Sequence, residues 1–369
     1  MFISIQNSSG TFAHGYEPMP LRTGYEPVLA ARVDDLYAQV AQQPGKVVSV
    51  SDTALTVEYK DGSTQTFQLG RRYGTVSSLV LPHQLETRLK AGDAFGEGDL
   101  LIFNSRYFVP DALQPNQAAW KMGMLVKTAI METADTLEDS SVISERVAGK
   151  MATEMVKVRD ITVNFRESIH RMVRVGDELE ADSILCTIED LSTGENAILD
   201  DESLDTLRFI AANTPKSKVR GRVERIEVFY NGDIDDMSES LQELTVISER
   251  NRKRLAKELG NRYISGRVDE TMRVDGDPLL LDNAVIRIHI NETVGVGVGD
   301  KFVFGNQLKT IVGRVMAGRN ETKSGIPLDA IFGYMSISNR IVASPEIIGT
   351  TNTLLKLISK RVAAQYFAA

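Results

Sequence analysis

The stretch that decides the fold is GDKFVFGNQLK, residues 299–309. Its two lysines, Lys301 and Lys309, lie eight positions apart on either side of a Gly-Asn pair, which is typical of tight turns. A three-residue loop over residues 304–306 predicts that the lysines lie opposite each other on one face of a hairpin. Like charges in that position repel unless an anion lies between them. The stretch therefore indicates either an anion site or an ordinary hairpin with two solvated lysines.

The composition is that of an ordinary globular protein. The 369 residues are 42% hydrophobic and 25% charged, which is enough for two or three domains with cores of their own. No apolar run approaches the roughly 18 residues of a membrane helix, and the N-terminal residues lack the pattern of a signal peptide. We therefore expect no membrane segment and a cytoplasmic location.

The residue types argue against thiol and zinc chemistry. Cys186 is the single cysteine, so disulfides within the chain and a cysteine zinc site are excluded. The four histidines are scattered, without the HxxxH or HxH spacing of metal ligands. The net charge of −8 also argues against a protein that binds nucleic acid alone. Any such role needs a local patch or a cleft shared with a partner.

Strand patterns dominate the first three quarters of the chain. Residues 219–230 are predicted to form a strand whose alternation changes register near Glu224, which indicates a bulge. Residues 285–290 alternate between apolar and polar side chains and lead into the glycine-rich segment 295–299. Residues 122–131 are predicted to form one mostly apolar strand.

Two helices are predicted. The first begins with a capping box formed by Ser240 and Glu243 and runs to Gly260, with a cluster of cations near its end. Cations suit the negative end of the helix dipole, so we interpret this cluster as a solvated helix end rather than a nucleic-acid contact. The second helix begins around Ser344 and carries apolar residues at helical spacing.

A Gly-Asp pair recurs in one context. It follows a small or β-branched residue three times, at residues 92–93, 176–177 and 299–300. Short strand patterns come after the first two pairs, which predicts turns between short barrel strands. Since only the third pair is followed by lysine, we interpret Gly-Asp as architectural and Lys301 as the unusual addition.

A second candidate site is acidic. Glu138 and Asp139 are adjacent, and carboxylate oxygens suit Mg²⁺, its bound water or nearby lysines. Taken alone, the pair equally fits a solvated loop. The acidic run at residues 233–236 directly follows a predicted hairpin turn, and we interpret it as a solvated loop.

Four segments, in chain order, resemble the β subunit of multisubunit DNA-directed RNA polymerases. Residues 299–309 keep the lysine spacing of the family's Gly-Asp-Lys and Gly-Asn-Lys-Gly motifs. Residues 137–147, LEDSSVISERV, are similar to its Phe-Glu-Asp segment and the Val-Ser-Glu-Arg sequence that follows. Residues 325–340 are similar to its Asn-Pro-Leu-Gly-Val-Pro-Ser-Arg segment and end at Arg340, and residues 20–28 look like the start of the family's second half.

The resemblance implies a fold that is mainly β with some α. It would be a double-psi β-barrel interrupted by an inserted flap-like domain and flanked by small β-barrel elements. The expected segments are an N-terminal β-rich region (1–115), the first part of the barrel (116–150), the inserted flap-like domain (151–283), the second part of the barrel (284–343) and a C-terminal helix (344–369).

The resemblance also implies roles for five residues. Lys301 and Lys309 would contact the RNA 3′ end and nucleotide phosphates, and Arg340 would clamp the incoming triphosphate. Glu138 and Asp139 would orient the second Mg²⁺ ion through water or neighbouring basic groups. The family's Asn-Ala-Asp-Phe-Asp-Gly-Asp motif, which holds the catalytic Mg²⁺, belongs to the β′ partner. We find no equivalent of it in this sequence, so no direct ligand of that ion is expected here.

The implied function is that of a β-like subunit, the C-terminal half, of a DNA-dependent RNA polymerase, a nucleotidyltransferase that is inactive alone. Its partners would be polypeptides like the β N-terminal half and the β′ halves, together with template DNA, transcript RNA and nucleoside triphosphates, and no membrane. A reading frame that starts at Met1 and holds only the second half of β resembles the split polymerases of giant, jumbo-type bacteriophages. The expected location is the cytoplasm of an infected bacterium or the virion.

Two other classes of function stay open. A non-catalytic β-rich structural or virion protein explains the β content and the acidity, but leaves the lysine spacing and Arg340 without a role. A phosphate-cradling loop at residues 295–299 would make the protein a nucleotide-binding enzyme. That segment lacks both the GxxxxGK[ST] pattern and a long following helix.

Overall fold

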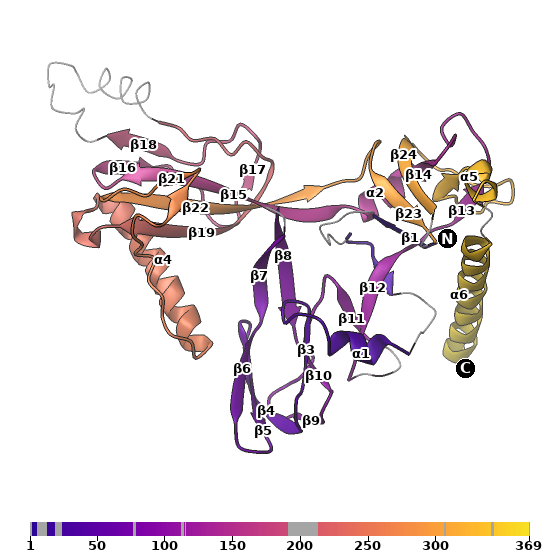
Figure 1. Cartoon of the computed structure of the whole chain (residues 1–369), viewed down its shortest axis with the longest axis horizontal. Helices are drawn as coiled ribbons and strands as arrows, with labels where there is room; N and C mark the ends of the chain where they lie inside the picture. Colours follow the sequence, from indigo (N-terminus) through magenta and orange to yellow (C-terminus); the bar gives the residue numbers. More distant parts are fainter. Residues whose placement is uncertain are drawn as a thin grey trace. The chain divides into compact units, whose positions relative to one another are not determined.

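The computed structural model describes residues 2–5, 13–18, 24–76, 79–111, 114, 116–190, 213–305, 308–340 and 343–368. The protein is mainly β, with several sheets and few helices (Figure 1), which confirms the predicted fold class at this level. The chain divides into two compact units. The first comprises Met1–Ser77, Leu81–Glu154 and Thr293–Ala369, and the second comprises Ser78–Val80 and Met155–Glu292.

The largest sheet of the first unit has the order β11-β12-β1-β23-β24-β14-β25-β13, with β2 paired to β12. Its strands are β1 (Phe2–Ile5), β2 (Glu17–Pro18), β11 (Phe108–Pro110), β12 (Ala118–Leu125), β13 (Thr128–Ile130), β14 (Ser140–Ser144), β23 (Lys301–Phe304), β24 (Leu308–Met316) and β25 (Ala330–Phe332). Two pairs are parallel, β14 with β24 and β13 with β25. This sheet therefore joins two parts of the chain that the second unit separates in the sequence. Over the described residues it is an open path rather than a closed barrel.

One face of this sheet is the core of that region. Phe302, Phe304 and Leu308 are fully buried there, together with Val312 and Phe332. Because side chains alternate across a strand, burying Phe302 and Phe304 places Lys301 on the opposite face. The helix α2 (Glu145–Lys150) follows β14 and contacts both β14 and β24.

The single strand predicted over residues 122–131 is wrong. The segment forms two strands, β12 and β13, with a break after Leu125. At the break, the Lys127 N–H donates to the carboxylate of Asp329 at 2.9 Å, and the backbone of Asp329 donates to the Lys127 carbonyl. This exchange with Asp329 replaces the ladder contacts that a continuous strand would make.

Two further groups of strands lie mainly in the first unit. The strands β4 (Gly45–Val50), β5 (Ala54–Tyr59), β6 (Thr64–Gln68) and β9 (Ala94–Phe95) form a four-stranded sheet. Near it in sequence lie α1 (Glu26–Ala30), β3 (Ala38–Val40), β7 (Gly70–Val76), β8 (Leu79–Glu86) and β10 (Leu100–Asn104), of which β8, β10 and β3 are consecutive in another sheet.

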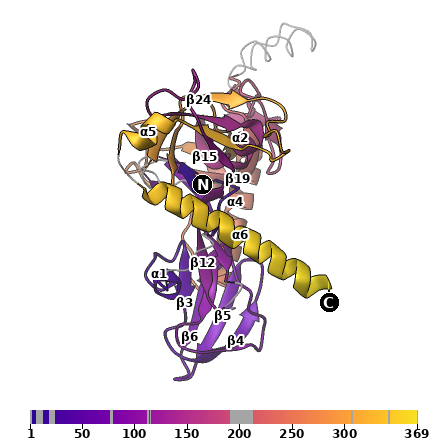
Figure 2. The same ribbon diagram turned by 90° about the vertical axis from the view of Figure 1, so that its right-hand side faces the viewer.

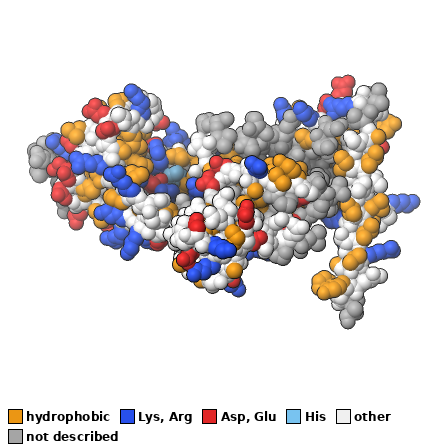
Figure 3. Space-filling model, turned by 60° about the horizontal axis from the view of Figure 1, so that its bottom comes forward, with side chains coloured by type: hydrophobic (Ala, Val, Ile, Leu, Met, Phe, Trp, Pro, Cys, Tyr) orange, Lys and Arg blue, Asp and Glu red, His pale blue; other side chains and the backbone are white. Residues whose placement is uncertain are grey.

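The predicted C-terminal helix is confirmed as α6 (Ser344–Ala368), one continuous helix in Figures 1 and 2. Many of its apolar side chains are exposed, and hydrophobic side chains lie along much of the helix at the right of Figure 3, with a few basic side chains among them. Of the helices in the described part of the chain, none combines the length and hydropathy that crossing a bilayer requires.

The second unit is built on the antiparallel pair β19 (Gly221–Asn231) and β22 (Asn283–Val294). Its other elements are β15 (Thr153–Asn164), β16 (Glu167–His170), β17 (Glu178–Leu179), β18 (Thr187–Asp190), η2 (Ile234–Asp236), α4 (Glu239–Glu258), β20 (Arg273–Val274) and β21 (Asp277–Pro278). The predicted bulge near Glu224 is confirmed, because the pairing of β19 with β22 shifts register between Val223 and Arg225.

The helix predicted from Ser240 to Gly260 is confirmed as α4, but its capping box is wrong. The helix begins at Glu239 after Ser238, and no side chain caps it. The Ser238 hydroxyl donates to the Glu167 carbonyl at 2.6 Å, and the Ser240 hydroxyl accepts from the Ile169 N–H at 2.7 Å. Tertiary contacts with β16 therefore take both hydroxyls that a local cap would use.

The three Gly-Asp turns share one geometry, which confirms that the pair is architectural. The glycines have φ of 92°, 103° and 96° at Gly92, Gly176 and Gly299, a region that favours glycine. Each aspartate accepts a hydrogen bond from the N–H three positions earlier, at 2.7 Å from Lys90, 2.8 Å from Arg174 and 2.8 Å from Gly297. The turns lead directly into β9, β17 and β23.

Candidate functional site

The lysine-bearing hairpin is formed by β23 and β24, but in a different register from the one predicted. Lys309 pairs with Val303, Lys301 pairs with Ile311, and Phe304 pairs with Leu308. Between the paired Phe304 and Leu308 lie Gly305 and two residues, Asn306 and Gln307, that are outside the described part of the chain. Lys301 and Lys309 are diagonal neighbours on one face rather than opposite each other. Such diagonal positions are typically about 7–8 Å apart.

Both lysines are exposed on the outer face of the sheet. Among the described residues, neither forms an ion pair with an acidic side chain. The next cation along β24, Arg314, differs because it pairs with Asp135 at 3.0 Å. The hairpin thus presents two neighbouring positive charges to solvent, an arrangement that suits a ligand with several anionic groups, such as a polyphosphate or a nucleic-acid backbone.

The Glu138-Asp139 loop lies directly before β14 in an unusual backbone conformation. Glu138 has a φ of 36° and Asp139 a φ of 61°, although neither is glycine. Such conformations cost on the order of 1–3 kcal/mol each and persist only where the surroundings impose them. Here the Ile311 N–H donates to the Asp139 carbonyl at 2.8 Å, and the Asp139 N–H donates to the Ser336 hydroxyl at 3.1 Å.

Two glycines allow neighbouring elements to approach this loop closely. A Cβ added to Gly313 in β24 would lie 2.6 Å from the Ser140 hydroxyl and 2.9 Å from the Asp135 carbonyl. A Cβ added to Gly333, before the helix α5 (Tyr334–Ser338), would lie 2.3 Å from the Thr136 carbonyl. Substituting either glycine would therefore push β24 or α5 away from the loop.

Arg340 reaches this loop from the other end of α5. One terminal nitrogen of its guanidinium, Nη2, donates to both carboxylate oxygens of Asp139, at 2.8 and 2.7 Å. The side chains are partly open to solvent, 36% exposed for Arg340 and 53% for Asp139. A guanidinium has five N–H donors, and among the guanidinium nitrogens of Arg340 only Nη2 has a hydrogen-bond partner within the described residues. The remaining donors are available to a ligand.

The structure brings the five predicted site residues into one region of the first unit. Lys301 and Lys309 lie on β23 and β24, and the backbone of Asp139 is bonded to Ile311 of β24, two residues beyond Lys309. Asp139 in turn contacts Arg340, and Glu138 is exposed beside it. In Figure 1 the elements concerned, β23, β24, β14 and α5, are labelled together at the right.

The donor set of this region is mixed rather than that of a metal cage. Over the described residues, no group of three histidine, cysteine, aspartate or glutamate side chains is placed to hold a metal ion. In this loop the carboxylate oxygens of Glu138 and Asp139 are the groups that could bind a cation. The Asp139 carboxylate, however, already accepts hydrogen bonds from Arg340. These carboxylates fit contact with metal-bound water better than the role of sole metal ligands.

Two residues that the sequence analysis missed also belong to this region. Glu132, just after β13, accepts a hydrogen bond from the Met335 N–H at 2.6 Å, and Ser336 accepts from Asp139. Both side chains attach α5 to the segment that holds Glu138 and Asp139. One sequence feature, Gly333, indicates such a contact. It precedes α5 and cannot cap the helix with a side chain, so the cap must come from another segment.

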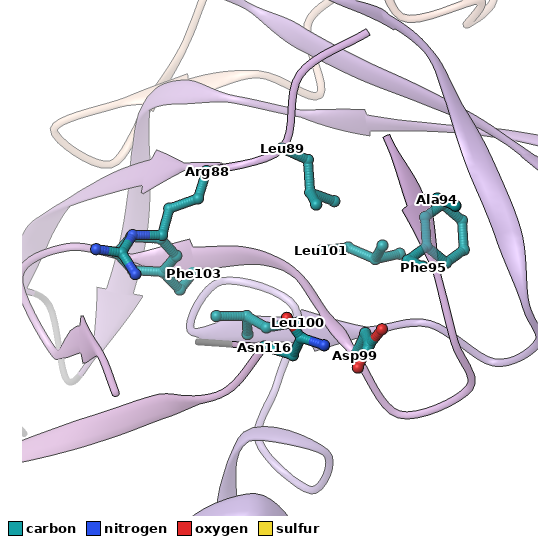
Figure 4. A pocket seen from close by; sticks show the side chains of 9 residues that line it. All are labelled: Arg88, Leu89, Ala94, Phe95, Asp99, Leu100, Leu101, Phe103 and Asn116. Carbon is teal, nitrogen blue, oxygen red and sulfur yellow. The ribbon is translucent and has the colours of Figure 1, made fainter. Parts of the chain in front are cut away.

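Neither of two other features coincides with this region. A small pocket of the first unit is lined by residues that include Arg88, Leu89, Phe95, Asp99 and Leu101 (Figure 4), and no predicted site residue lines it. The glycine-rich segment 295–299 leads into the strand β23 instead of a helix, and its Gly297 N–H is taken by Asp300. The segment therefore lacks the loop-to-helix geometry of a GxxxxGK[ST] phosphate loop.

No model of a known protein family matches the chain. A search of curated proteins finds no match either.

Proposed function

We propose that this chain is a β-like subunit, equivalent to the C-terminal half of β, of a multisubunit DNA-dependent RNA polymerase. The observation that carries the proposal is the contact between Asp139 and Arg340, which lie 201 positions apart in the sequence. Each belongs to a separate segment that resembles the polymerase family. Their meeting beside the strand that carries Lys309 supports one shared site rather than four chance similarities.

A finer fold belongs to the same proposal. The parallel pairs β14–β24 and β13–β25 interleave the two parts of the chain. This interleaving supports a double-psi β-barrel in the first unit. The second unit would then be the flap-like insertion, since it enters the sequence between the strands β14 and β23.

In the proposed reaction the RNA 3′ oxygen attacks the α-phosphorus of a nucleoside triphosphate, and pyrophosphate leaves. Lys301 and Lys309 would hold the RNA 3′ end and the nucleotide phosphates, and would stabilise the negative charge of the transition state. Arg340 would bind triphosphate oxygens with the donors that Asp139 does not use. Fixed positive groups of this kind supply much of the catalysis of phosphoryl transfer.

A bound Mg²⁺ ion, held mainly by a β′-like partner, would neutralise phosphate charge and activate the attacking oxygen. Glu138 and Asp139 would orient the water shell of the second ion from this chain. Since neither lysine nor Arg340 can replace the partner's carboxylates, the proposal makes the isolated chain inactive.

The surface around the site supports a partner chain. Met131 and Leu137 on the acidic segment are exposed, and so are Tyr334 and Met335 on α5. Exposed apolar side chains grouped at a charged site are typical of a surface that another protein covers. The proposed partners are polypeptides like the β N-terminal half and the β′ halves, with template DNA, transcript RNA and nucleoside triphosphates. Giant bacteriophages are the proposed source of such an assembly. Its proposed location is the infected bacterium or the virion.

Co-purification tests the proposal. The tagged full chain is recovered with its natural partners, the partners are sequenced, and template-dependent RNA synthesis is measured for the complex and for the chain alone. We expect one partner to carry the Asn-Ala-Asp-Phe-Asp-Gly-Asp motif, and only the complex to synthesise RNA. A complex in which no polypeptide carries that motif would overturn the proposal. Recovery with virion polypeptides alone, and no RNA synthesis, would favour the non-catalytic structural alternative.

A further inference from the structure

The helix α5 lacks a cap of its own. Its N-cap residue is Gly333, which has no side chain to bond the free N–H groups of the first turn. The Met335 N–H in that turn donates instead to the Glu132 carboxylate at 2.6 Å, from a residue 203 positions away in the sequence. Glu132 therefore supplies the cap that the local sequence omits.

A local cap could not replace Glu132. A Cβ at Gly333 would lie 2.3 Å from the Thr136 carbonyl and 3.2 Å from the Glu132 carboxylate itself. A serine or aspartate at this position would therefore collide with the backbone of the acidic segment. The close approach of α5 to that segment requires both the glycine and a cap from elsewhere.

The same helix determines where Arg340 lies. It has only five residues, and so short a helix is not stable by itself. Glu132 bonds its first turn, and the hydroxyl of Ser336, which is buried, accepts from the Asp139 N–H at 3.1 Å. Arg340 follows two residues after the helix ends and closes on the Asp139 carboxylate. The bond to Glu132 is thus the contact that holds the first turn of the helix that Arg340 follows.

We infer that Glu132 is a positioning residue, which fixes α5 and thereby holds Arg340 ready for the triphosphate. The inference rests on the proposed function of Arg340. Glu132 is itself exposed and lies outside the core, so its replacement leaves the packing of the unit intact. Its loss should raise the KM for nucleoside triphosphate about fivefold, the size expected for losing one helix cap, with a smaller change in kcat.

The first measurement uses the full chain without partners. Hydrogen exchange of the peptide over residues 333–340 is compared for the wild type, Glu132→Ala, Glu132→Gln and Glu17→Ala. Glu17 is a matched control, because its carboxylate accepts the Leu125 N–H at 2.8 Å elsewhere in the same sheet. We expect faster exchange for Glu132→Ala only, since the amide oxygen of glutamine still accepts the bond. Unchanged hydrogen exchange in Glu132→Ala would overturn the inference, whether or not the proposed function of the chain is correct.

The second measurement uses the assembled complex and the KM for nucleoside triphosphate. We expect a rise of about fivefold for Glu132→Ala, recovery with Glu132→Gln, and no further rise when Glu132→Ala is added to Arg340→Ala. If Arg340→Ala raises the KM but Glu132→Ala does not, the inference is wrong and the proposed function stands. If Arg340→Ala has no effect either, the proposed role of Arg340 fails as well.

Discussion

Two groups of charged residues, one in each unit of the protein, differ in whether the fold neutralises them. In the second unit, Glu227 lies 2.7 Å from Arg225 and 3.5 Å from Arg252, and Asp160 pairs with Arg287 at 2.6 Å, all partly buried. In the first unit, Lys301 and Lys309 are exposed and, among the described residues, have no acidic partner. The charges around Glu227 and Asp160 are neutralised within the fold, whereas Lys301 and Lys309 are available to a ligand.

The electrostatics of the second unit fit this reading. Burial raises the pKa of Glu227, but the hydrogen bond with His289 and the charges of Arg225 and Arg252 outweigh it, so the pKa ends below its usual value. Arg252 also lies over the Phe229 ring at 4.4 Å, and its side chain is only 17% exposed. The interpretation of the α4 cations as a solvated helix end is therefore wrong for Arg252, which packs against β19.

The largest expected effect on the exposed side of this comparison is that of Arg340→Ala. Nucleotide incorporation by the assembled complex should fall about a hundredfold in kcat/KM, because hydrogen bonds to a charged ligand are worth about 1.5–3 kcal/mol. The free energy of unfolding of the free chain should change little, since the pair with Asp139 is solvent-exposed. Arg319→Ala, which removes an exposed arginine paired with Glu321, is the matched control. Equal incorporation by both variants would remove Arg340 from the site.

The buried side of the comparison predicts a loss of stability instead. Asp160→Ala leaves Arg287 partly buried without its carboxylate, and should lower the free energy of unfolding by about 2 kcal/mol. Glu180→Ala is the control, because its pair with Arg220 is highly exposed and should contribute far less. Urea denaturation followed by circular dichroism measures both. If the two variants lose the same stability, the second unit does not depend on its buried charges.

A buried histidine extends the comparison to the first unit. Burial, with the charges of Arg106 and other arginines, lowers the pKa of His83 to about 4. The unfolded chain takes up this proton below about pH 6.5, while the folded chain does not. Stability should therefore fall by about 1.5 kcal/mol between pH 6.5 and 5, because the unfolded state binds more protons in that window.

Trp120, the only tryptophan of the chain, reports unfolding of the first unit through its fluorescence. In the wild type, the Asn104 Nδ2 lies 2.8 Å from the His83 Nδ1. The variant His83→Asn keeps a hydrogen-bond acceptor near Asn104 but cannot titrate. We expect its stability to vary less with pH over this window. A slope equal to that of the wild type would assign the pH dependence to other groups.

The smallest expected effect concerns Glu227. Because its pKa is lowered in the folded state, its contribution to stability is complete above an unfolded pKa of about 4.5 and is lost as pH falls through the folded value. Glu227→Gln should weaken this acid dependence, measured by circular dichroism during acid titration. Glu243→Gln, an exposed position of the same helix-bearing unit, should leave the acid limb unchanged. Identical acid limbs for Glu227→Gln and the wild type would contradict the paired state of Glu227.

Local sequence patterns predicted the features that a few neighbouring residues control. The bulge near Glu224 and the three Gly-Asp turns are examples, because strand alternation and the freedom of glycine at positive φ decide them. Tertiary contacts decided the features that were predicted wrongly. Ser240 bonds β16 instead of capping α4, and Asp329 breaks the strand predicted over residues 122–131.

The register of the lysine hairpin shows both influences. Alternation correctly placed Lys301 and Lys309 on one face. The observed register pairs Phe304 with Leu308 in the core and moves the lysines from opposite to diagonal positions, which lessens their repulsion. The turn residues alone could not distinguish these two registers.

The sequence named the residues of the candidate site, but not the residues whose contacts hold them in place. The resemblance named Asp139 and Arg340, whereas nothing in the local pattern around Glu132 indicates that it caps a helix 203 positions away. The positive φ of Asp139 likewise depends on Ile311 and Ser336, which only the folded chain brings to it. The domain boundaries and the roles of the five site residues remain predictions.

The central claim is that the exposed lysines bind the phosphates of RNA and nucleotide. The most direct measurement is the rate of single-nucleotide addition by the assembled complex carrying Lys309→Ala, beside Lys323→Ala as an exposed lysine on another loop of the same unit. We expect Lys309→Ala to slow addition about a hundredfold, the usual effect of removing one group that stabilises transition-state charge, and Lys323→Ala to behave as the wild type. Addition at the wild-type rate by a correctly assembled Lys309→Ala complex would contradict the claim.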